Sequence, residues 1–469
     1  MVRQYTALFL SLVSLAAAPT SFAFSPLHQT SSTPLSNTIL SSTFCAEADL
    51  HQLTHIPPSD STLSSARGWM EHIEQQEGPK FGVGSYTVLR CDAILHPKND
   101  VSTQEYCEWK IWGEQFHMDR LSSSFRTLTE NLFGPASLES GFGSFQGGGI
   151  TSMSGMGSSV HTQSMSADSI KESRFVMNTL LEQASRSIIS DNAGNFQEER
   201  SLTHTLMLTI LWTPSATSDG SSQAVKPKVR GHAAFTNTTP PSILPTPITA
   251  SLAIPKQPTL EALSVLPRRH GMNLNQQRQV GSSASAKLSS WCRIRRPLED
   301  PNRYKPPGVG EVILVRQPNT DERGTNIMTY SNDKFIETLE LLEGLISNLF
   351  VVYRDGTVRT APVGLVLPGY ARHLIIQELN ERGLKVDSSK PPTMQDMRDG
   401  LWSEVFVTSA IRLVVPVERI IMPAVGANVD PVVLWEASNN EYEMTKTIQA
   451  AIYERGSSQA TVKNVVIYD

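Results

Sequence analysis

The sequence predicts a protein of mixed helices and strands, of α/β or α+β class, because its second half alternates runs of strand length with helical segments. Val312–Val315, Leu349–Tyr353 and Glu404–Thr408 are predicted as strands. Leu374–Leu379 belongs to a helix that should end near Gly383. A chain of 469 residues, 39% of them hydrophobic, is long enough to bury an ample core in two or three domains.

The first half contains elements of the same two kinds. An amphipathic helix is predicted over residues 59–78 and a strand over Gly82–Ile94. From about Gln104 to Leu128, apolar residues recur at helical spacing, which predicts a second helix. The remaining predicted elements are a helix after the capping-box pattern Ser169–Glu172 and the strands Thr205–Trp212 and Val229–Phe235.

Composition divides the chain into segments. Residues 55–237 are predicted as an N-terminal α/β domain, and residues 259–469 as a C-terminal domain. The Pro-rich stretch 238–258 is the best candidate for a linker between them. Residues from about 134 to 168 are rich in Gly, Ser and Met and almost uncharged, which predicts a disordered insertion rather than a phosphate-binding loop.

The N-terminus has the order of residue types that is typical of a removable targeting sequence. Arg3 precedes an apolar run, and small residues stand before a possible cleavage site at Ala23, so residues 1–23 are predicted as a signal peptide. Residues 24–46 are rich in Ser and Thr without Asp or Glu, as in plastid transit peptides. The junction around Phe24 resembles the bipartite plastid presequence of diatoms and related algae. Plastid localisation is therefore expected, with secretion as the alternative, and no membrane anchor after processing.

Charge and cysteine content exclude some function classes. A formal net charge of −5 gives no electrostatic reason to expect nucleic-acid binding. The four cysteines are scattered, without a CxxC pair or a histidine at ligand spacing. Neither a disulfide framework nor a metal site is therefore expected.

Four local patterns could carry chemistry. His117 and Arg120 lie three residues apart in Phe116–Leu121, on one face of a predicted helix. Lys287 stands in an Ala- and Ser-rich segment before Trp291. The other two patterns are listed by their sequences: Glu343-Gly344-Leu345-Ile346-Ser347-Asn348-Leu349-Phe350 with Asp355-Gly356 and Thr360-Ala361-Pro362 after it, and the turn Leu367-Pro368-Gly369-Tyr370-Ala371-Arg372, which opens a helix.

Each pattern alone also has a purely structural interpretation. An isolated lysine is usually a solvated surface charge, and a histidine with an arginine can be an exposed helix face. Glu343 beside Gly344 could be a turn carboxylate, and Pro-Gly turns precede helices in many folds. Their order along the chain is what favours a functional site.

In this order the patterns resemble class IV aminotransferases, the family of branched-chain and D-amino-acid aminotransferases and aminodeoxychorismate lyase. The resemblance covers about residues 80–130 and 280–425, and its specific part is Glu343–Arg372. A closer resemblance is to an aminotransferase-like subgroup of plants and algae. That subgroup shares tracts like Val229-Arg230-Gly231-His232 and Lys287-x-x-x-Trp291-x-Arg293-x-Arg295-x-x-Leu298-Glu299.

The resemblance implies a fold type IV enzyme of two domains with pyridoxal phosphate between them, the C-terminal domain binding the cofactor. It assigns to Lys287 the amine that binds the cofactor covalently and carries the substrate's α-proton. Glu343 would face the cofactor's pyridine nitrogen. The remaining cofactor-binding assignments concern the phosphate: Arg120, the amides of Tyr370 and Ala371, and Ser409 with Ala410.

Two positions depart from the family. A tyrosine five residues after the lysine is replaced by Cys292, and a phosphate-contacting threonine is replaced by Ala410. The implied reaction is transamination of an amino acid with a 2-oxo acid by a homodimer. The alternatives are a lyase like aminodeoxychorismate lyase, or a non-catalytic relic of the fold that binds a ligand or partner.

Overall fold

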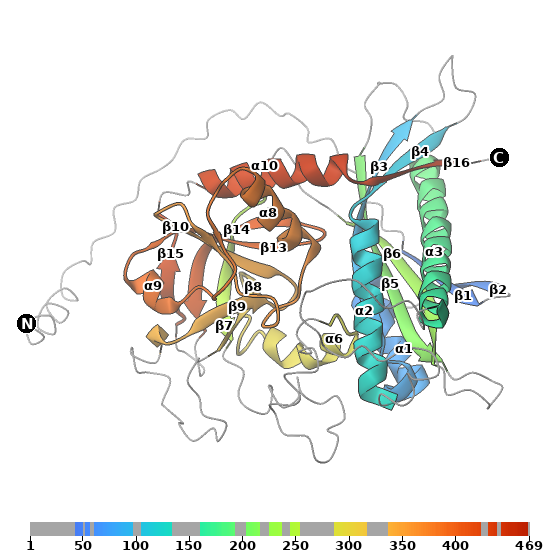
Figure 1. The fold of residues 1–469 in the computed structure, drawn as a ribbon, viewed down its shortest axis with the longest axis horizontal. Helices are drawn as coiled ribbons and strands as arrows, with labels where there is room; N and C mark the ends of the chain where they lie inside the picture. The colour runs from blue at the N-terminus through green and yellow to red at the C-terminus, as the bar shows by residue number, and fades with distance from the viewer. Residues whose placement is uncertain are drawn as a thin grey trace, which may run out of the picture. The chain divides into compact units, whose positions relative to one another are not determined.

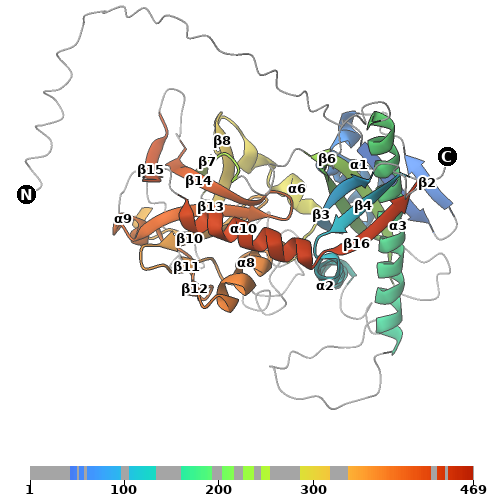
Figure 2. The same cartoon turned by 90° about the horizontal axis from the view of Figure 1, so that it is seen from above.

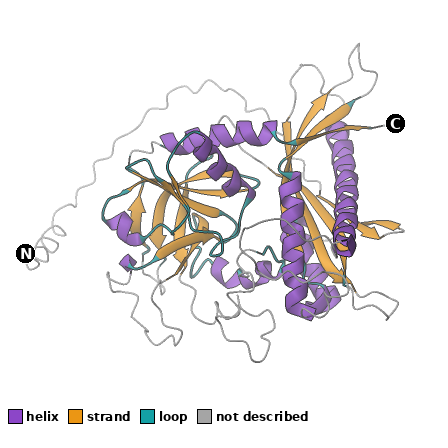
Figure 3. Ribbon diagram, in the orientation of Figure 1, coloured by secondary structure: helices purple, strands orange, loops and turns teal. Residues whose placement is uncertain are grey.

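The computed structural model (Figures 1 and 3) describes these parts of the chain: residues 43–49, 52–56, 61–96, 105–133, 160–192, 203–215, 225–236, 244–253, 286–316, 336–423, 430–438 and 442–467. The predicted signal peptide and nearly all of the predicted transit peptide lie outside these ranges, so the targeting sequence stays a prediction. Within the described ranges, no helix has the length and apolarity that a membrane span requires.

The first sheet is antiparallel throughout, with the strand order β16-β4-β3-β5-β6-β1-β2. Its central strands are long: Ser85 of β3 pairs with Trp212 of β5, and the pairing continues to Ile94 and Thr203. The strands are β1 (Thr43–Asp49), β2 (Gln52–Ile56), β3 (Ser85–His96), β4 (Tyr106–Ile111), β5 (Thr203–Ser215), β6 (Lys226–Thr236) and β16 (Thr461–Val466).

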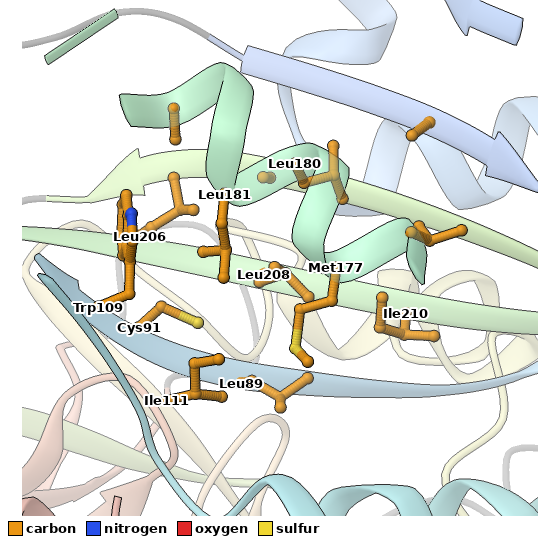
Figure 4. Packing of buried hydrophobic residues seen from close by; sticks show 14 of the residues in the cluster. Leu89, Cys91, Trp109, Ile111, Met177, Leu180, Leu181, Leu206, Leu208 and Ile210 are labelled. Atoms are coloured by element: carbon orange, nitrogen blue, oxygen red, sulfur yellow. The ribbon is translucent and has the colours of Figure 1, made fainter. Parts of the chain in front are cut away.

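Helices cover both faces of this sheet because β3 presents alternate side chains to each face. Leu89 and Cys91 point into a core shared with α2 (Glu114–Phe133) and α3 (Val160–Asn192). Figure 4 shows Leu180 and Met177 of α3 packed over these strands. Tyr86 points to the opposite face, where it packs with residues of η1 (Ser61–Ser64) and α1 (Ala66–Phe81).

The second sheet runs β12-β11-β10-β13-β14-β7-β8-β9, with β15 paired to β14. An additional pair, Asn348 of β10 with Glu343 of β9, joins its two sides, so the strands from β10 round to β9 close into a barrel. The strands are β7 (Ile248–Ala253), β8 (Val309–Arg316), β9 (Glu340–Gly344), β10 (Asn348–Tyr353), β11 (Val358–Arg359), β12 (Val386–Asp387), β13 (Trp402–Ser409), β14 (Leu413–Met422) and β15 (Val432–Glu436).

The remaining helices lie between the strands of the second sheet or follow them along the chain. Between β7 and β8 lie α6 (Ser290–Ile294) and η4 (Arg296–Glu299). The second sheet also carries α8 (Tyr370–Glu381), α9 (Met394–Arg398) and α10 (Glu443–Ser458). The chain then returns from α10 to the first sheet, where β16 pairs with β4 (Figures 1 and 2).

The strands and helices predicted for the second half are present, but three expectations for the first half are wrong. Residues 106–111 form β4 rather than part of a helix, because pairing with β3 and β16 buries alternate residues there. The helix α3 begins at Val160, inside the expected insertion of 134–168. The expected linker 238–258 contains β7, a strand paired on both sides, whose last four residues are buried.

The predicted end of the transit peptide, at residue 46, falls inside the first strand of the structure. Strand β1 begins at Thr43, and its Cys45 and Ala46 are buried between neighbouring elements. Cleavage after residue 46 would remove most of the pairing between β1 and β6. The folded part of the chain therefore starts no later than Thr43, which is also earlier than the expected domain start at residue 55.

Truncating Leu180 should destabilise the first sheet's core. Its side chain is fully buried, so Leu180→Ala leaves a cavity and should lower the free energy of unfolding by about 2–5 kcal/mol. Phe175→Ala on the same helix is the matched control, because Phe175 is 53% exposed, and it should change that free energy by less than about 1 kcal/mol. Equilibrium urea denaturation measures both, and equal losses would contradict the assignment of this core.

Candidate functional site

The backbone around Lys287 is attached to the first sheet, although it comes from the second half of the chain. Tyr86 N donates to Lys287 O at 2.9 Å, and Ser289 N donates to Gly84 O at 2.8 Å. Lys287 N in turn donates to Ser124 Oγ of α2 at 3.0 Å. These bonds fix the lysine at the start of β3, facing the helix that carries Arg120.

The amine of Lys287 lies in an electrostatic setting unlike that of a surface lysine. The residue is half-buried, and its Nζ is 5.1 Å from the centre of the Tyr86 ring. Desolvation, helped by the charges of Arg120 and Arg295, lowers the pKa of Lys287 to about 7. A large fraction of the amine is therefore uncharged, and so nucleophilic, near neutral pH.

Glu343 lies at the seam that closes the barrel. Its Oε2 accepts hydrogen bonds from Leu367 N at 3.0 Å and from Asn348 Nδ2 at 3.3 Å. Burial raises the pKa of Glu343 to about 8, although the Leu367 amide and the nearby charges of Lys287 and Arg372 act in the opposite direction. The Glu343 carboxyl and the Lys287 amine are thus near enough for each to affect the other's pKa.

A second carboxyl beside Glu343 was not expected from the sequence. Glu311 of β8 is buried, and its Oε2 accepts a hydrogen bond from Ser347 Oγ at 2.8 Å. Burial raises the pKa of Glu311. Its position in an ordinary strand, Val309–Arg316, gave no local signal of a site.

Arg120 is a buried cation whose partners are all neutral. Its Nη2 donates to Thr87 Oγ1 at 2.9 Å and its Nη1 to Pro368 O at 3.3 Å, while His117 Nδ1 lies 2.7 Å from the same Thr87 hydroxyl. Burial lowers the pKa of Arg120 to about 10, and burial also lowers the pKa of His117 well below its usual range. Among the described residues, no carboxylate pairs with Arg120, and its buried Nε has no hydrogen-bond partner.

The N-terminus of α8 lies beside Arg120. The helix begins at Tyr370, so the Tyr370 and Ala371 amides lack intrahelical acceptors, and Gly369 provides no side-chain cap. A Cβ at Gly369 would come within 2.2 Å of Asn348 Oδ1, so glycine is required for this close approach. Asn348 Nδ2 donates to Leu367 O at 2.8 Å, which ties the turn to Glu343.

Ser409 and Ala410 lie at the hairpin between β13 and β14, and both are half-buried. Ser409 Oγ accepts a hydrogen bond from Arg412 N at 3.2 Å, within the turn. Arg90 of β3 donates to Ile411 O at 2.6 Å, so the first sheet holds the hairpin tip. Among the described contacts, none joins Ser409 or Ala410 to Lys287 or Arg120.

The structure therefore brings together Lys287, Glu343, Arg120 and the start of α8, and it places Ser409 and Ala410 on an adjoining hairpin. Nothing in the sequence indicated that Glu311 would lie at the site. Nor did it indicate that the Arg295 side chain would point inward, although Arg295 belongs to the tract after Lys287 that resembles the plant and algal subgroup. Cys292, which replaces the family's tyrosine, is buried against Tyr86, so a tyrosine ring still lies beside the lysine.

Comparison with known proteins places part of this chain in a family. Residues 274–420 match the family model described as amino-transferase class IV, a range that includes Lys287, Glu343 and the start of α8. This region is a class IV aminotransferase domain. The match confirms the predicted family, the fold type IV class, pyridoxal phosphate as the cofactor and a pyridoxal-phosphate-dependent aminotransferase as the class of enzyme. The plant and algal subgroup stays a prediction.

Solved structures with a similar arrangement are aminotransferases. A fold IV-transaminase from Curtobacterium pusillum is 12% identical with a TM-score of 0.47, over 88% of this chain and 98% of that one. The branched-chain aminotransferase from Thermoproteus uzoniensis with norvaline is 12% identical with a TM-score of 0.41, over 89% and 96%. A hypothetical aminotransferase from Mycobacterium tuberculosis, in a PLP-bound form, is 12% identical with a TM-score of 0.42, over 89% and 99%.

No curated protein matches the sequence. These TM-scores are below 0.5, and the family match covers residues 274–420 of the chain.

The residues present fit pyridoxal phosphate. The cofactor's aldehyde requires an uncharged amine, and the pKa of Lys287 is lowered to about 7. Its phosphate requires an unopposed cation, and Arg120 keeps a buried N–H without a partner beside the first turn of α8. Its ring nitrogen requires a carboxyl, which Glu343 provides.

The reactivity of Lys287 should reveal its lowered pKa. In the cofactor-free protein, trinitrobenzenesulfonate labelling of Lys287, followed by peptide mass spectrometry, should reach half its maximum near pH 7. Arg120→Gln removes a positive neighbour and should move this midpoint to higher pH. The exposed Lys385 is the internal control for the reagent. A midpoint near the ordinary value of about 10.4 would contradict the burial of this amine.

Proposed function

We propose that the chain catalyses transamination between an amino acid and a 2-oxo acid with pyridoxal phosphate, as branched-chain aminotransferases do. The observation that carries the proposal is the convergence of Lys287 and Glu343, which are far apart in the sequence. Trp291, four residues after Lys287, donates from its Nε1 to Leu345 O at 2.8 Å, in the turn after Glu343. The motif from Glu343 to Arg372 supports the branched-chain type.

Each residue has a distinct role in this proposal. Lys287 Nζ would hold the cofactor and, once released from it, would accept and return the proton of the substrate's α-carbon. Glu343, oriented by the hydrogen bond from the Leu367 amide, would hold the cofactor through its ring nitrogen and favour the protonated form of that nitrogen. Arg120 and the amides of Tyr370 and Ala371 hold the phosphate. Ser409 and Ala410, at the β13–β14 hairpin, complete the predicted phosphate-binding set.

When bound, the cofactor supplies an electron sink that stabilises the carbanion formed when the α-proton leaves. The protein's contribution is to keep the proton-carrying amine uncharged and to hold a carboxyl opposite the ring. Because burial raises the pKa of Glu343 to about 8 in spite of the charges of Lys287 and Arg372, a further cation at the ring nitrogen would lower that pKa and favour the ionised carboxyl. The Glu343 carboxyl is therefore placed by the fold where a positive partner would stabilise its ionised form.

Replacing Lys287 should abolish covalent cofactor binding. The purified protein with pyridoxal phosphate should show visible absorbance, and borohydride should fix the cofactor onto Lys287. Lys287→Ala should lose both signals, whereas the exposed Lys385→Ala should keep them. Glu343→Gln should keep the covalent link but reduce kcat, followed as 2-oxo acid released from an amino acid, roughly a hundredfold. Unchanged absorbance in Lys287→Ala would refute the assignment.

The enzyme is proposed to act as a homodimer. Ile346 and Val363 are 51% and 60% exposed, and they lie on the two loops that flank Glu343. Exposed apolar side chains next to a site favour burial by a second copy of the chain.

Sedimentation of the wild-type chain at micromolar concentration should give the mass of a dimer. Replacing both Ile346 and Val363 by aspartate should shift it toward the monomer, because charges would be buried at the interface. Val432→Asp, an equally exposed change on β15, is the control and should leave the dimer intact. A monomeric wild-type chain would overturn the proposal.

A further inference from the structure

Arg295 stands apart from the other arginines in the tract that follows Lys287. It comes directly after α6, and 11% of its side chain is exposed, against 61% for Arg293 and 59% for Arg296. Those two outward arginines pair with Glu74 and Glu71 of α1. Arg295 is therefore the member of the tract that points into the protein.

The guanidinium of Arg295 has few partners in the part of the chain that the structure describes. Its Nε lies 3.1 Å from Glu299 Oε1, yet this buried N–H makes no hydrogen bond. Its terminal nitrogens bond to no described acceptor. The guanidinium has five donors in a planar fork and one neighbouring carboxylate, which leaves most of its hydrogen-bonding capacity unused.

The local charges do not neutralise Arg295. Glu299 is also paired with Arg67 of α1, so two arginines share one carboxylate. Across the whole cluster, four arginines face three glutamates. The arginines are Arg67, Arg293, Arg295 and Arg296, and the glutamates are Glu71, Glu74 and Glu299. We assign the unbalanced positive charge to Arg295, because its one carboxylate partner, Glu299, is also paired with Arg67.

Arg295 lies on the side of α6 that faces the proposed catalytic amine. Cys292, three residues earlier, shares its helical face and packs against Tyr86. The Nζ of Lys287 in turn lies 5.1 Å from the centre of the Tyr86 ring. The charge of Arg295 also lowers the pKa of Lys287, as does that of Arg120. The amine is thus flanked by two cations from different elements, α2 and the end of α6.

We propose that Arg295 binds the carboxylate of the amino-acid or 2-oxo-acid substrate, as a second anion site beside Lys287 and distinct from the phosphate site at Arg120. This inference extends the proposed function and depends on it. Arg120 is joined to the turn that opens α8, where the phosphate is proposed to bind. Arg295 has no such contact among the described residues, so its open fork is free to take a second anion in bidentate fashion.

Arg412 is another arginine near the site, and it fits this role less well. Its Nη2 lies 3.8 Å from the carboxylate of Glu311, which is buried and shared with no other described arginine. Its charge is therefore opposed within the protein. Arg295 lacks a carboxylate of its own and is the better anion receptor.

Binding of carboxylates without an amino group isolates this contact from the chemistry. Glutarate and 4-methylpentanoate are titrated into the pyridoxal-phosphate-loaded enzyme by calorimetry, with the cofactor monitored by its absorbance. Arg295→Gln should weaken binding of at least one probe about tenfold or more while cofactor affinity is unchanged. Loss for both probes identifies the α-carboxylate as the group bound, and loss for glutarate alone identifies a distal carboxylate.

Arg296→Gln is the matched control, because it removes an equal charge from the same tract at an exposed position, and it should leave both titrations unchanged. Arg295→Lys keeps the charge but loses the planar fork, so it should give a partial loss and serves if Arg295→Gln is unstable.

Unchanged probe binding in both Arg295 variants would overturn the inference. Reduced cofactor affinity with unchanged probe binding would do the same, since it would move Arg295 to the phosphate. A wild-type enzyme that binds the cofactor on Lys287 but neither probe also overturns it and leaves the proposed function standing. A wild-type protein that does not bind the cofactor would instead refute the proposed function.

Discussion

Two backbone hydrogen bonds, between residues 84–86 and 287–289, hold the candidate site together. They attach a lysine from the second half of the chain to the first strand of the central β3–β5 ladder. Lys287 is half-buried there, and its Nζ lies 5.1 Å from the centre of the Tyr86 ring. Trp291 strengthens the attachment on the other side, because its Nε1 donates to Leu345 O in the turn after Glu343. Residues 287–291 thus bond both to the start of β3 and to the turn after Glu343, which holds the Lys287 segment near the Glu343 carboxyl.

The chemistry of the site follows from an excess of positive charge, on Arg120 and Arg295, around an amine that is partly removed from solvent. Arg120 has only neutral partners, and Arg295 shares its carboxylate with Arg67. Both cations lower the pKa of Lys287, as desolvation does. The fold is therefore suited to anions on both sides of an uncharged amine. A phosphate and a carboxylate are the anions that the proposed reaction brings to such an amine.

The carboxyl side of the site depends on the closure of the barrel. Glu343 and Asn348 form the pair that joins β9 to β10, and both bond to Leu367. Gly369 allows the approach of Asn348 because a Cβ there would collide with it. One asparagine thus connects the Glu343 carboxyl to the helix whose amides are proposed to hold phosphate. Changes in this turn should affect both groups together.

The sequence by itself determined the local chemistry: the order of Lys287, Glu343 and the Pro-Gly turn, and most strands of the second half. Such features depend on neighbouring residues, and strand periodicity or a helix start needs no distant partner. Tertiary structure alone decided which residues meet. Residues 106–111 became a strand because β3 and β16 pair with it, and Glu311 entered the site because the barrel closes. Arg295 differs from Arg293 and Arg296 only in the direction that the packing of α6 gives it, and no local pattern encodes that direction.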